Sequence, residues 1–153
     1  MVGHSERRTG GETEEQISRK VAAVAEAELV PILFVGEDTR DDDAIQQTEH
    51  RLRRGLSRVD AARRPVLAVY EPSWAIGAEE AAPTEHIGAV VHRVKAVLRE
   101  LGSPAPAVIY GGTVAEQNID ELARLEVLDG VGATRASLEA RTFLSIVDRL
   151  RPV

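Results

Sequence analysis

The stretch AVYEPSWAIG at residues 68–77 decides the fold of this chain, because an apolar run leads directly to a carboxylate and then to a turn. The run at residues 66–70 has the length and composition of a buried strand. A buried strand has no packing use for an acid, so Glu71 is either solvated where the strand ends or held at a functional site. The proline, tryptophan and glycine that follow at once favour a structured loop.

Other short apolar runs predict further strands on both sides of this stretch. Residues 32–35 form a continuous apolar run that ends in Gly-Glu, as expected for a strand buried on both faces. Residues 107–110 form another run, which is followed by a glycine pair, and residues 128–133 form a weaker one. Residues 1–2 resemble the end of a fifth strand.

Apolar residues recur at helical spacing in the segments between these runs. Thr13 and Gln16 have the spacing of a capping pair at the start of the first long helix. The arginine-rich outer face of the second helix is expected to be solvated. The expected helices are residues 12–28, 45–59, 87–101, 119–125 and 138–150.

Short apolar strands that alternate with longer helices predict an α/β fold with a parallel sheet. A length of 153 residues and a hydrophobic content of 43% suit one domain, and we expect residues 1–153 to form it. A closed barrel of eight βα units needs about 250 residues, so this chain is too short for a complete one.

Composition argues against several classes of function. A net charge of −6 and a pI near 5.3, without a long basic run, give no surface for nucleic acid or an anionic membrane. The chain has no cysteine and its four histidines show no ligand spacing, so we expect no disulfide, metal site or cofactor. No apolar run approaches the roughly 20 residues of a membrane span, and the N-terminus has no signal-peptide pattern. The expected compartment is the cytoplasm.

Polar and glycine residues follow the strands, and in a parallel sheet these positions share the face where active sites are built. Three of the motifs are GHSERR at residues 3–8, YEPSWAIG at residues 70–77 and YGGTV at residues 110–114. In order and spacing they resemble the triosephosphate isomerase family at its fourth, sixth and seventh barrel strands. The resemblance spans residues 2–150 and implies a partial (β/α)8 TIM barrel that lacks the first three βα units.

The resemblance implies an aldose–ketose isomerase acting on a small phosphorylated sugar. In the family, dihydroxyacetone phosphate and glyceraldehyde 3-phosphate interconvert through an enediol(ate), a step of glycolysis and gluconeogenesis. The resemblance makes Glu71 the base that moves the carbon-bound proton, and His4, neutral at a helix N-terminus, the group that polarises the carbonyl. Glu6 corresponds to a further carboxylate of the site, or else pairs only with a neighbouring arginine. Glu37 is similar to a family glutamate that seats the segment around the base.

The resemblance also implies a phosphate site and a lid. Gly77, Gly112 and Thr113 correspond to positions whose backbone N–H groups grip the phosphate. Residues 72–84 correspond to the lid that closes over the substrate. Trp74 is the first anchor of that lid, or simply a packing residue.

Two departures from the family pattern resemble its tetrulose-phosphate isomerase branch, whose substrate, erythrulose phosphate, is one carbon longer. The family's Gly-Gly pair is replaced by Thr134 and Arg135. Arg135 either donates to the phosphate or partly fills the site. The lid carries Ala-Glu-Glu-Ala-Ala at residues 78–82, and its acids suit an anionic substrate only if they point outward.

The family's first strand supplies an asparagine and a lysine that this chain lacks, and Lys20 and Lys95 both fall within expected helices. Without that cation the enediolate is less stabilised, so we expect the chain by itself to be inactive or weakly active. One hypothesis is the C-terminal portion of an isomerase, with Met1 an internal methionine or a misplaced start; its full-length relatives are expected to be homo-oligomers. The second is a half-barrel that self-associates or pairs with a separate N-terminal chain. The third is an inactive relic.

Overall fold

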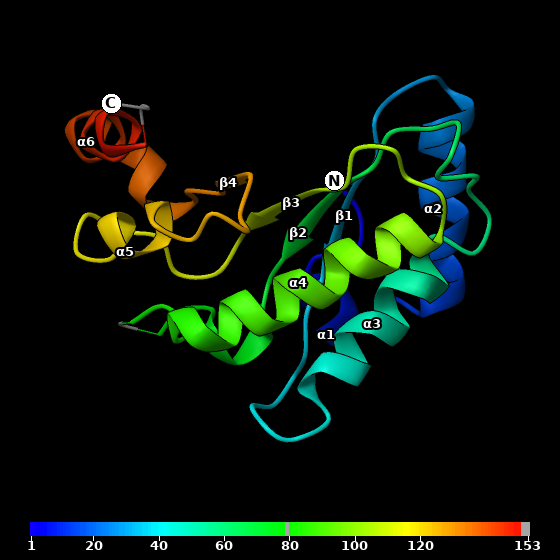
Figure 1. Cartoon of the computed structure of the whole chain (residues 1–153), viewed down its shortest axis with the longest axis horizontal. Coiled ribbons are helices and arrows are strands. Elements are labelled where there is room, and N and C mark those ends of the chain that lie inside the picture. The colour runs from blue at the N-terminus through cyan, green and yellow to red at the C-terminus, as the bar shows by residue number, and fades with distance from the viewer. Residues whose placement is uncertain (79, 151–153) are drawn as a thin grey trace.

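Four short parallel strands alternate with helices along the chain (Figure 1). The computed structural model describes residues 1–78 and 80–150. Neighbouring strands are hydrogen-bonded in chain order, and Val2 adds a parallel bridge to Leu33. The prediction of parallel βα repeats is confirmed, although the last strand is only two residues long. The strands are β1 (Ile32–Val35), β2 (Leu67–Tyr70), β3 (Ala107–Tyr110) and β4 (Gly130–Val131).

The expected capping pair is present at the start of the first long helix, where the Thr13 hydroxyl accepts the Gln16 N–H and the Gln16 side chain accepts the Thr13 N–H. The last helix begins at Ala140 and not at Leu138, which lies in a 3₁₀ turn and is exposed. Within the described ranges, no helix is both long enough and apolar enough to cross a membrane. The α-helices are α1 (Ser5–Thr9), α2 (Glu14–Glu26), α3 (Ala44–Gly55), α4 (Thr84–Glu100), α5 (Ile119–Ala123) and α6 (Ala140–Arg149), and the 3₁₀ helices are η1 (Ser73–Ala75) and η2 (Arg135–Leu138).

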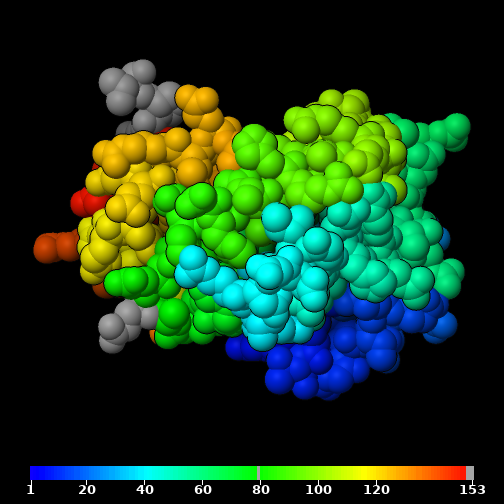
Figure 2. Space-filling model, turned by 60° about the horizontal axis from the view of Figure 1, so that its bottom comes forward, coloured from blue at the N-terminus to red at the C-terminus, as the bar shows by residue number. Residues whose placement is uncertain are grey.

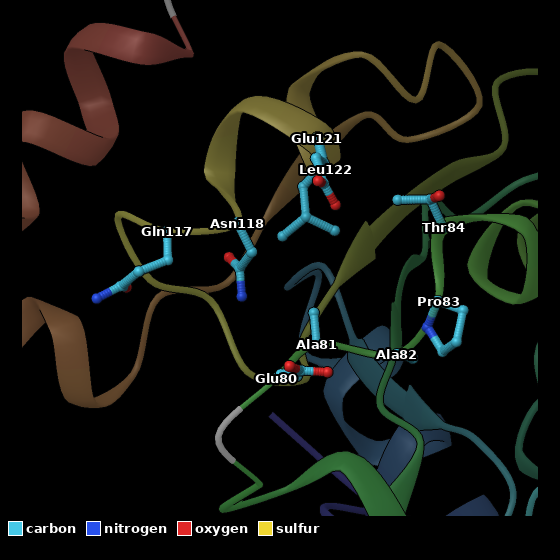
Figure 3. Close-up of a pocket in the computed structure, with 9 residues that line it drawn as sticks. All are labelled: Glu80, Ala81, Ala82, Pro83, Thr84, Gln117, Asn118, Glu121 and Leu122. Atoms are coloured by element: carbon cyan, nitrogen blue, oxygen red, sulfur yellow. The ribbon is translucent and has the colours of Figure 1, made fainter.

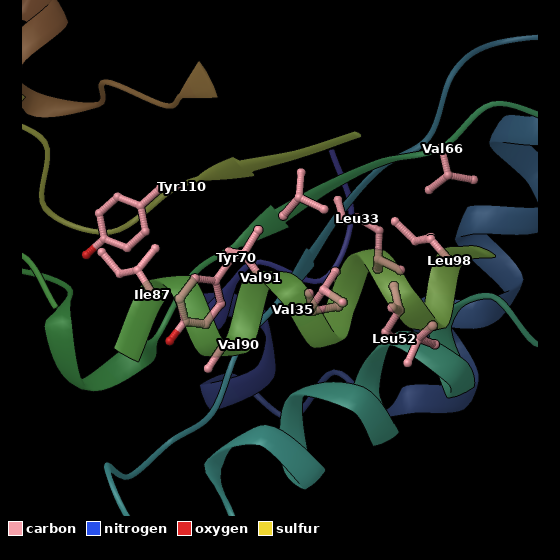
Figure 4. Packing of buried hydrophobic residues seen from close by; sticks show 14 of the residues in the cluster. Leu33, Val35, Leu52, Val66, Tyr70, Ile87, Val90, Val91, Leu98 and Tyr110 are labelled. Carbon is pink, nitrogen blue, oxygen red and sulfur yellow. The ribbon is translucent and has the colours of Figure 1, made fainter. Parts of the chain in front are cut away.

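One face of the sheet is covered by helices and holds the core (Figure 4). Because side chains alternate along a strand, residues in matching register form rows on the same face. The rows on the covered face are Leu33, Ala68 and Val108, then Val35, Tyr70 and Tyr110. These side chains are buried together with Leu52 of α3 and Ile87 of α4. Burial is worth roughly 1.5–3 kcal/mol for each large apolar side chain, so this layer is the main source of stability.

The opposite face of the sheet is only partly covered. Ile32 and Phe34 are half-buried, whereas Leu33 and Val35 are buried. The expectation that residues 32–35 are buried on both faces is therefore wrong. The physical reason is that α3 and α4 pack on the other face of these strands, so the alternate side chains face a side that the described helices leave partly open.

The helices divide into two groups along the molecule. In the first group, α2 packs on α3 and α3 packs on α4, while α5 and α6 contact each other at the far end (Figure 1). The space-filling view has the yellow and red C-terminal segments at one end and the blue N-terminal residues beneath the cyan and green helices (Figure 2). The loop that follows β2 leads to α4 in the first group, and the loop that follows β3 leads to α5 at the far end.

Candidate active site

The loops that follow the parallel strands meet in one small pocket, with a volume of about 70 Å³. Its wall combines residues from the loops after Val2, β2, β3 and β4, as expected where parallel strands end at one edge of a sheet. All the site residues expected from the sequence except Glu6 belong to this wall. The lining residues are His4, Glu71, Ile76, Gly77, Gly111, Gly112, Thr113, Val114, Thr134 and Arg135.

His4 and Glu71 are in direct contact in this pocket. Nε2 of His4 lies 3.0 Å from Oε1 of Glu71, and Oε2 of Glu71 accepts the backbone N–H of Ser5 at 3.0 Å. The Glu71 side chain is only 4% exposed. The end of β2 thus delivers a buried carboxylate to the start of α1, where two donors hold it.

The hydrogen bonds of His4 decide which ring nitrogen carries the proton. His4 is the N-cap of α1, and its Nδ1 accepts the backbone N–H of Glu6 at 3.3 Å. A nitrogen that accepts an N–H carries no proton, so the neutral ring has its proton on Nε2. Nε2 therefore donates to Glu71, and the imidazole presents a hydrogen-bond donor to the pocket.

Burial raises the pKa of Glu71 above its ordinary value, because the charged carboxylate loses contact with water. The Ser5 N–H and His4 act in the opposite direction, and the negative charge of Glu6 adds to the rise. A carboxyl group whose pKa is raised within a pocket is suited to take up and return a proton near neutral pH.

A second buried carboxylate, Glu37, holds the segment that carries Glu71. The Glu37 side chain follows β1 and is fully buried, and its Oε1 accepts the Tyr70 hydroxyl and the Trp74 indole N–H, each at 2.9 Å. The backbone N–H of Ser73 donates to the Glu37 carbonyl oxygen at 2.9 Å. Residues on both sides of Glu71 are thus tied to Glu37, which agrees with the expectation that this glutamate seats the segment. Trp74 is more than a packing residue.

The far side of the pocket carries the groups expected to hold a phosphate. Gly77 has a φ of 75°, a conformation that residues with a side chain rarely adopt. A Cβ atom at Gly77 would come within 3.9 Å of a guanidinium nitrogen of Arg135. Gly112 lies against the Tyr110 ring with no room for a side chain. The arrangement puts bare backbone beside a positive charge, which suits an anion.

Hydroxyl groups from β3 and the turn after it hold both parts of the segment expected to form the lid, residues 72–78 and 80–84. The Thr113 hydroxyl donates to the carbonyl oxygen of Ala75 at 2.8 Å, and the Tyr110 hydroxyl accepts the Ala82 N–H at 3.0 Å. Both the first and the last part of the lid are therefore joined to the same strand end. Of the two acids expected on the lid, Glu79 lies outside the described residues, and Glu80 lines a different pocket.

Glu6 does not line the pocket. Its side chain is 86% exposed, and its carboxylate lies 3.9 Å from Nδ1 of His4. The lysines lie elsewhere too, because Lys20 pairs with Glu12 and Lys95 pairs with Asp129. Among the described residues that line the pocket, Arg135 is the one side chain with a permanent positive charge.

Two arginines support the site, one of them within the motif at residues 3–8 and the other on α3, without a clear signal in the sequence. Arg8 donates to the carbonyl oxygens of Gly3 at 2.8 Å and Phe34 at 3.2 Å, which braces the loop of His4. Arg51 donates to the carbonyl oxygen of Gly36 at 2.6 Å, and its side chain is only 15% exposed. The expectation of a solvated arginine face is therefore wrong for Arg51. Its long side chain lies at the margin of that face and reaches the end of β1.

A larger pocket, with a volume of about 490 Å³, lies between the end of the lid and the start of α5 (Figure 3). Neither His4 nor Glu71 lines it. Its ionisable side chains are the carboxylates of Glu80 and Glu121, which would repel a phosphate. This pocket is therefore not the candidate active site despite its size. Its lining is residues 80–84, Gln117, Asn118, Glu121 and Leu122.

Comparisons with known proteins agree with one another. The triosephosphate isomerase family model matches residues 1–150. Triosephosphate isomerases of Rubrobacter xylanophilus, Gloeobacter violaceus and a Synechocystis strain are 36%, 38% and 38% identical to this chain, over 99%, 97% and 97% of its length. The same matches cover 62%, 61% and 61% of those relatives, so the chain spans about 60% of their length. Together with the four parallel strands, these matches make the fold a partial TIM barrel.

Proposed function

The chain belongs to the triosephosphate isomerase family, and we propose that its pocket interconverts dihydroxyacetone phosphate and glyceraldehyde 3-phosphate through an enediol(ate). The observation that carries this proposal is the contact between His4 and Glu71, a donor and a buried carboxylate 3.0 Å apart at the ends of parallel strands. The interconversion needs one group that removes a proton from carbon and one that protonates the neighbouring oxygen. This pair supplies both.

In the proposed reaction, Glu71 takes the proton from the carbon next to the carbonyl group. The electrons of that C–H bond form a carbon–carbon double bond, and the carbonyl π electrons move to the oxygen, which receives the proton from Nε2 of His4. Glu71 then returns its proton to the former carbonyl carbon, while Nε2 of His4 takes up the hydroxyl proton of the other oxygen, whose carbon becomes the new carbonyl carbon. The exchange restores both groups and involves no net oxidation. Because Nε2 and the carboxylate contact each other directly, the substrate has to enter between them.

The phosphate group is proposed to bind on the far side of the pocket. Backbone N–H groups of Gly77, Gly112 and Thr113 and the guanidinium group of Arg135 would hold it there. No hydrogen bond or ion pair engages the Arg135 side chain within the part of the chain that the structure describes, so its donors are free to meet an anion. Arginine suits this role because its planar guanidinium group can donate two parallel hydrogen bonds to a phosphate.

We propose that the chain by itself is a weak catalyst. The enediolate carries developing negative charge, and electrostatic stabilisation of such charge is usually the largest catalytic contribution. Arg135 is the one permanent cation in the described lining, and both lysines are ion-paired elsewhere.

A tetrulose phosphate such as erythrulose phosphate is the alternative substrate. The specific observation in its favour is that Thr134 and Arg135 put side chains where the family pattern has glycines, and both line the pocket. Side chains at these positions change the shape of the phosphate end, and a substrate one carbon longer would sit differently against them.

A further alternative is a non-catalytic half-barrel, or a relic, that has to associate with another chain. The chain spans about 60% of its relatives' length. The open face of the sheet, with half-buried Ile32 and Phe34, would be covered by such a partner. Exposed apolar surface of this kind is typical of an interaction site.

The test is a coupled isomerase assay of the purified chain on dihydroxyacetone phosphate and on erythrulose phosphate. It is run alone and with a separate polypeptide that carries the first three βα units of a relative. Glu71→Gln should abolish turnover, whereas Glu126→Gln, at an exposed position, should leave it unchanged. Light scattering on the same samples gives the oligomeric state.

Turnover that depends on Glu71 supports the proposal, and the preferred substrate decides between the triose and the tetrulose. Turnover that appears only with the added polypeptide supports the half-barrel that needs a partner. Absence of turnover on both substrates, with and without that polypeptide, would contradict an isomerase and favour the relic.

A further inference from the structure

His86 lies in the first turn of α4, two residues after the end of the lid segment, and no step of the proposed reaction uses it. Its Nε2 lies 2.9 Å from Oε1 of Glu37, and its ring meets the Trp74 indole edge-on with centroids 5.7 Å apart. The His86 side chain is 17% exposed, and the Glu37 side chain is fully buried. A histidine held in this way is a fixed part of the structure.

The hydrogen bond runs from His86 to Glu37. Oε1 of Glu37 also accepts the Trp74 indole N–H, a group that can only donate. The same oxygen accepts the Tyr70 hydroxyl, and Oε2 accepts the Thr48 hydroxyl. Glu37 is therefore an acceptor throughout, and Nε2 of His86 carries a proton.

Through Glu37, these donors connect both ends of the lid to the strand end that carries Glu71. Tyr70 directly precedes Glu71, Trp74 stands near the start of the lid, and His86 follows its end. Trp74, near the start of the lid, and His86, just after its end, both donate to the same oxygen of Glu37. Fixing both ends of a loop on one buried group lowers the number of conformations that the loop and the adjoining strand end can adopt.

We propose that His86 is a positioning residue, which holds the end of the lid on Glu37 and thereby fixes Trp74 and the strand end that carries Glu71. The kinetic consequence rests on the proposed function, because it takes Glu71 as the base. The structural consequence does not, since it concerns only the orientation of Trp74. The hydrogen bond from Nε2, and not only the packing of the ring, is what matters.

Trp74 is the only tryptophan of the chain, so its fluorescence reports directly on this contact. Acrylamide quenching and the emission maximum are measured in the purified chain for His86→Leu, which keeps apolar packing but cannot donate. His86→Gln keeps a donor at a similar reach. His92→Leu is the matched control, because His92 is exposed on the same helix. Circular dichroism checks that each variant folds. If His86→Leu does not fold, His86→Met is used in its place.

We expect stronger quenching and a shift to longer wavelength in His86→Leu, with both restored in His86→Gln and absent in His92→Leu. In the isomerase assay, kcat should fall roughly tenfold in His86→Leu, with KM nearly unchanged. A tenfold fall is what the loss of about one hydrogen bond that aligns the base would cause. His86→Gln should recover most of it.

The proposal is overturned if His86→Leu has the same fluorescence as the unaltered chain, or if His86→Gln behaves like His86→Leu. The second result would mean that ring packing, and not the hydrogen bond, holds the lid. If the unaltered chain has no turnover on either substrate, with or without the added polypeptide, the proposed function fails, yet the fluorescence comparison still decides the role of His86.

Discussion

The backbone carbonyl group of Glu71 passes directly across Gly36, so that a Cβ atom at position 36 would overlap its oxygen and carbon. The N–H of Glu71 donates to the carbonyl oxygen of Val35 at 2.7 Å, and Arg51 holds the carbonyl oxygen of Gly36 at 2.6 Å. The close approach of the β1 end to the β2 end therefore depends on a residue without a side chain. It also sets where the carboxylate of Glu71 lies.

Gly36→Ala should move the end of β2 away from β1 and misplace Glu71. We expect the free energy of unfolding to fall by about 1–3 kcal/mol, the usual cost of overpacking. Turnover should fall by roughly 10²-fold, since displacements of about 1 Å have effects of that size. Urea unfolding and the coupled assay measure the two quantities.

Gly88→Ala is the matched control for this substitution. Gly88 lies inside α4, and a Cβ atom there would meet nothing within 4 Å. Alanine should raise the free energy of unfolding by roughly 0.5–1 kcal/mol, because glycine is a poor helix former. Equal effects of the two substitutions would argue against the close approach at Gly36.

The pH dependence of turnover should reveal the raised pKa of Glu71. The base must be ionised, so kcat/KM should fall as the pH drops through a value above the ordinary 4.5 of a glutamate. Burial favours the neutral carboxyl group of Glu71 in the folded state. The stability that this neutral group contributes is therefore fully present below its unfolded-state pKa and is lost as the pH rises through its folded-state pKa. A pH–rate profile from pH 4 to 8 measures the pH at which kcat/KM falls, which is the acid limb of the profile.

Glu6→Gln should shift the same limb slightly toward lower pH, because the charge of Glu6 adds to the rise in the pKa of Glu71. The shift should be smaller than the whole rise, since burial is the largest cause. A limb at or below pH 4.5 in the unaltered chain would contradict the assignment of Glu71 as a buried base.

Much of the fold could be predicted because local patterns determine it. The strands at 32–35 and 107–110 have the predicted bounds, since continuous apolar runs there are bounded by proline or glycine residues. The run at 128–133 shortens to Gly130–Val131, where a glycine with φ of 159° offers no side chain to pack. Helix α1 has only five residues, too few for helical spacing to appear.

The candidate site could be predicted in its motifs, but of its supports only Glu37 was expected. The strings around His4 and Glu71 mark the pocket because each follows a strand directly. His86 and Arg51 gave no such signal, because each lies on a helix whose periodicity indicates the core-facing side and not the reach of a polar side chain to a strand end. Glu6 sits next to the site in sequence, yet its side chain points to solvent.

Arg135 should matter for binding more than for the chemical step. Arg135→Met should raise KM for the phosphorylated substrate by roughly 10- to 100-fold, the loss of hydrogen bonds to a charged group, with a smaller effect on kcat. Arg135→Lys should recover part of the loss, because lysine keeps the charge but not the planar geometry. Inhibition by inorganic phosphate should weaken in parallel.

Arg141→Met, at an exposed position of α6, is the control for the loss of one positive charge. A lower KM in Arg135→Met than in the unaltered chain would mean that Arg135 fills the site and does not hold the phosphate. Comparing the triose with the tetrulose substrate in the same variants would also test whether Arg135 contributes to the choice between them.

Glu49 should make stability depend on pH in the acid range. It accepts from Arg93 at 2.6 and 2.7 Å and from Arg53 at 2.8 Å, linking α3 to α4, and these hydrogen bonds, those of Arg93 first, lower its pKa to about 2. Because the folded-state pKa is below the unfolded-state value, the contribution is present above pH 4.5 and is lost as the pH falls toward 2. Urea midpoints of the unaltered chain and Glu49→Gln should therefore differ most above pH 4.5 and converge near pH 2.

Glu126→Gln is the control, because Glu126 has no ion pair among the described residues, and its urea midpoints should run parallel to those of the unaltered chain. In 1 M salt the difference caused by Glu49→Gln should shrink, because the side chains of this ion pair are partly exposed. A difference that is unchanged at pH 2 would show that Glu49 stabilises the helix pair by packing and not by charge.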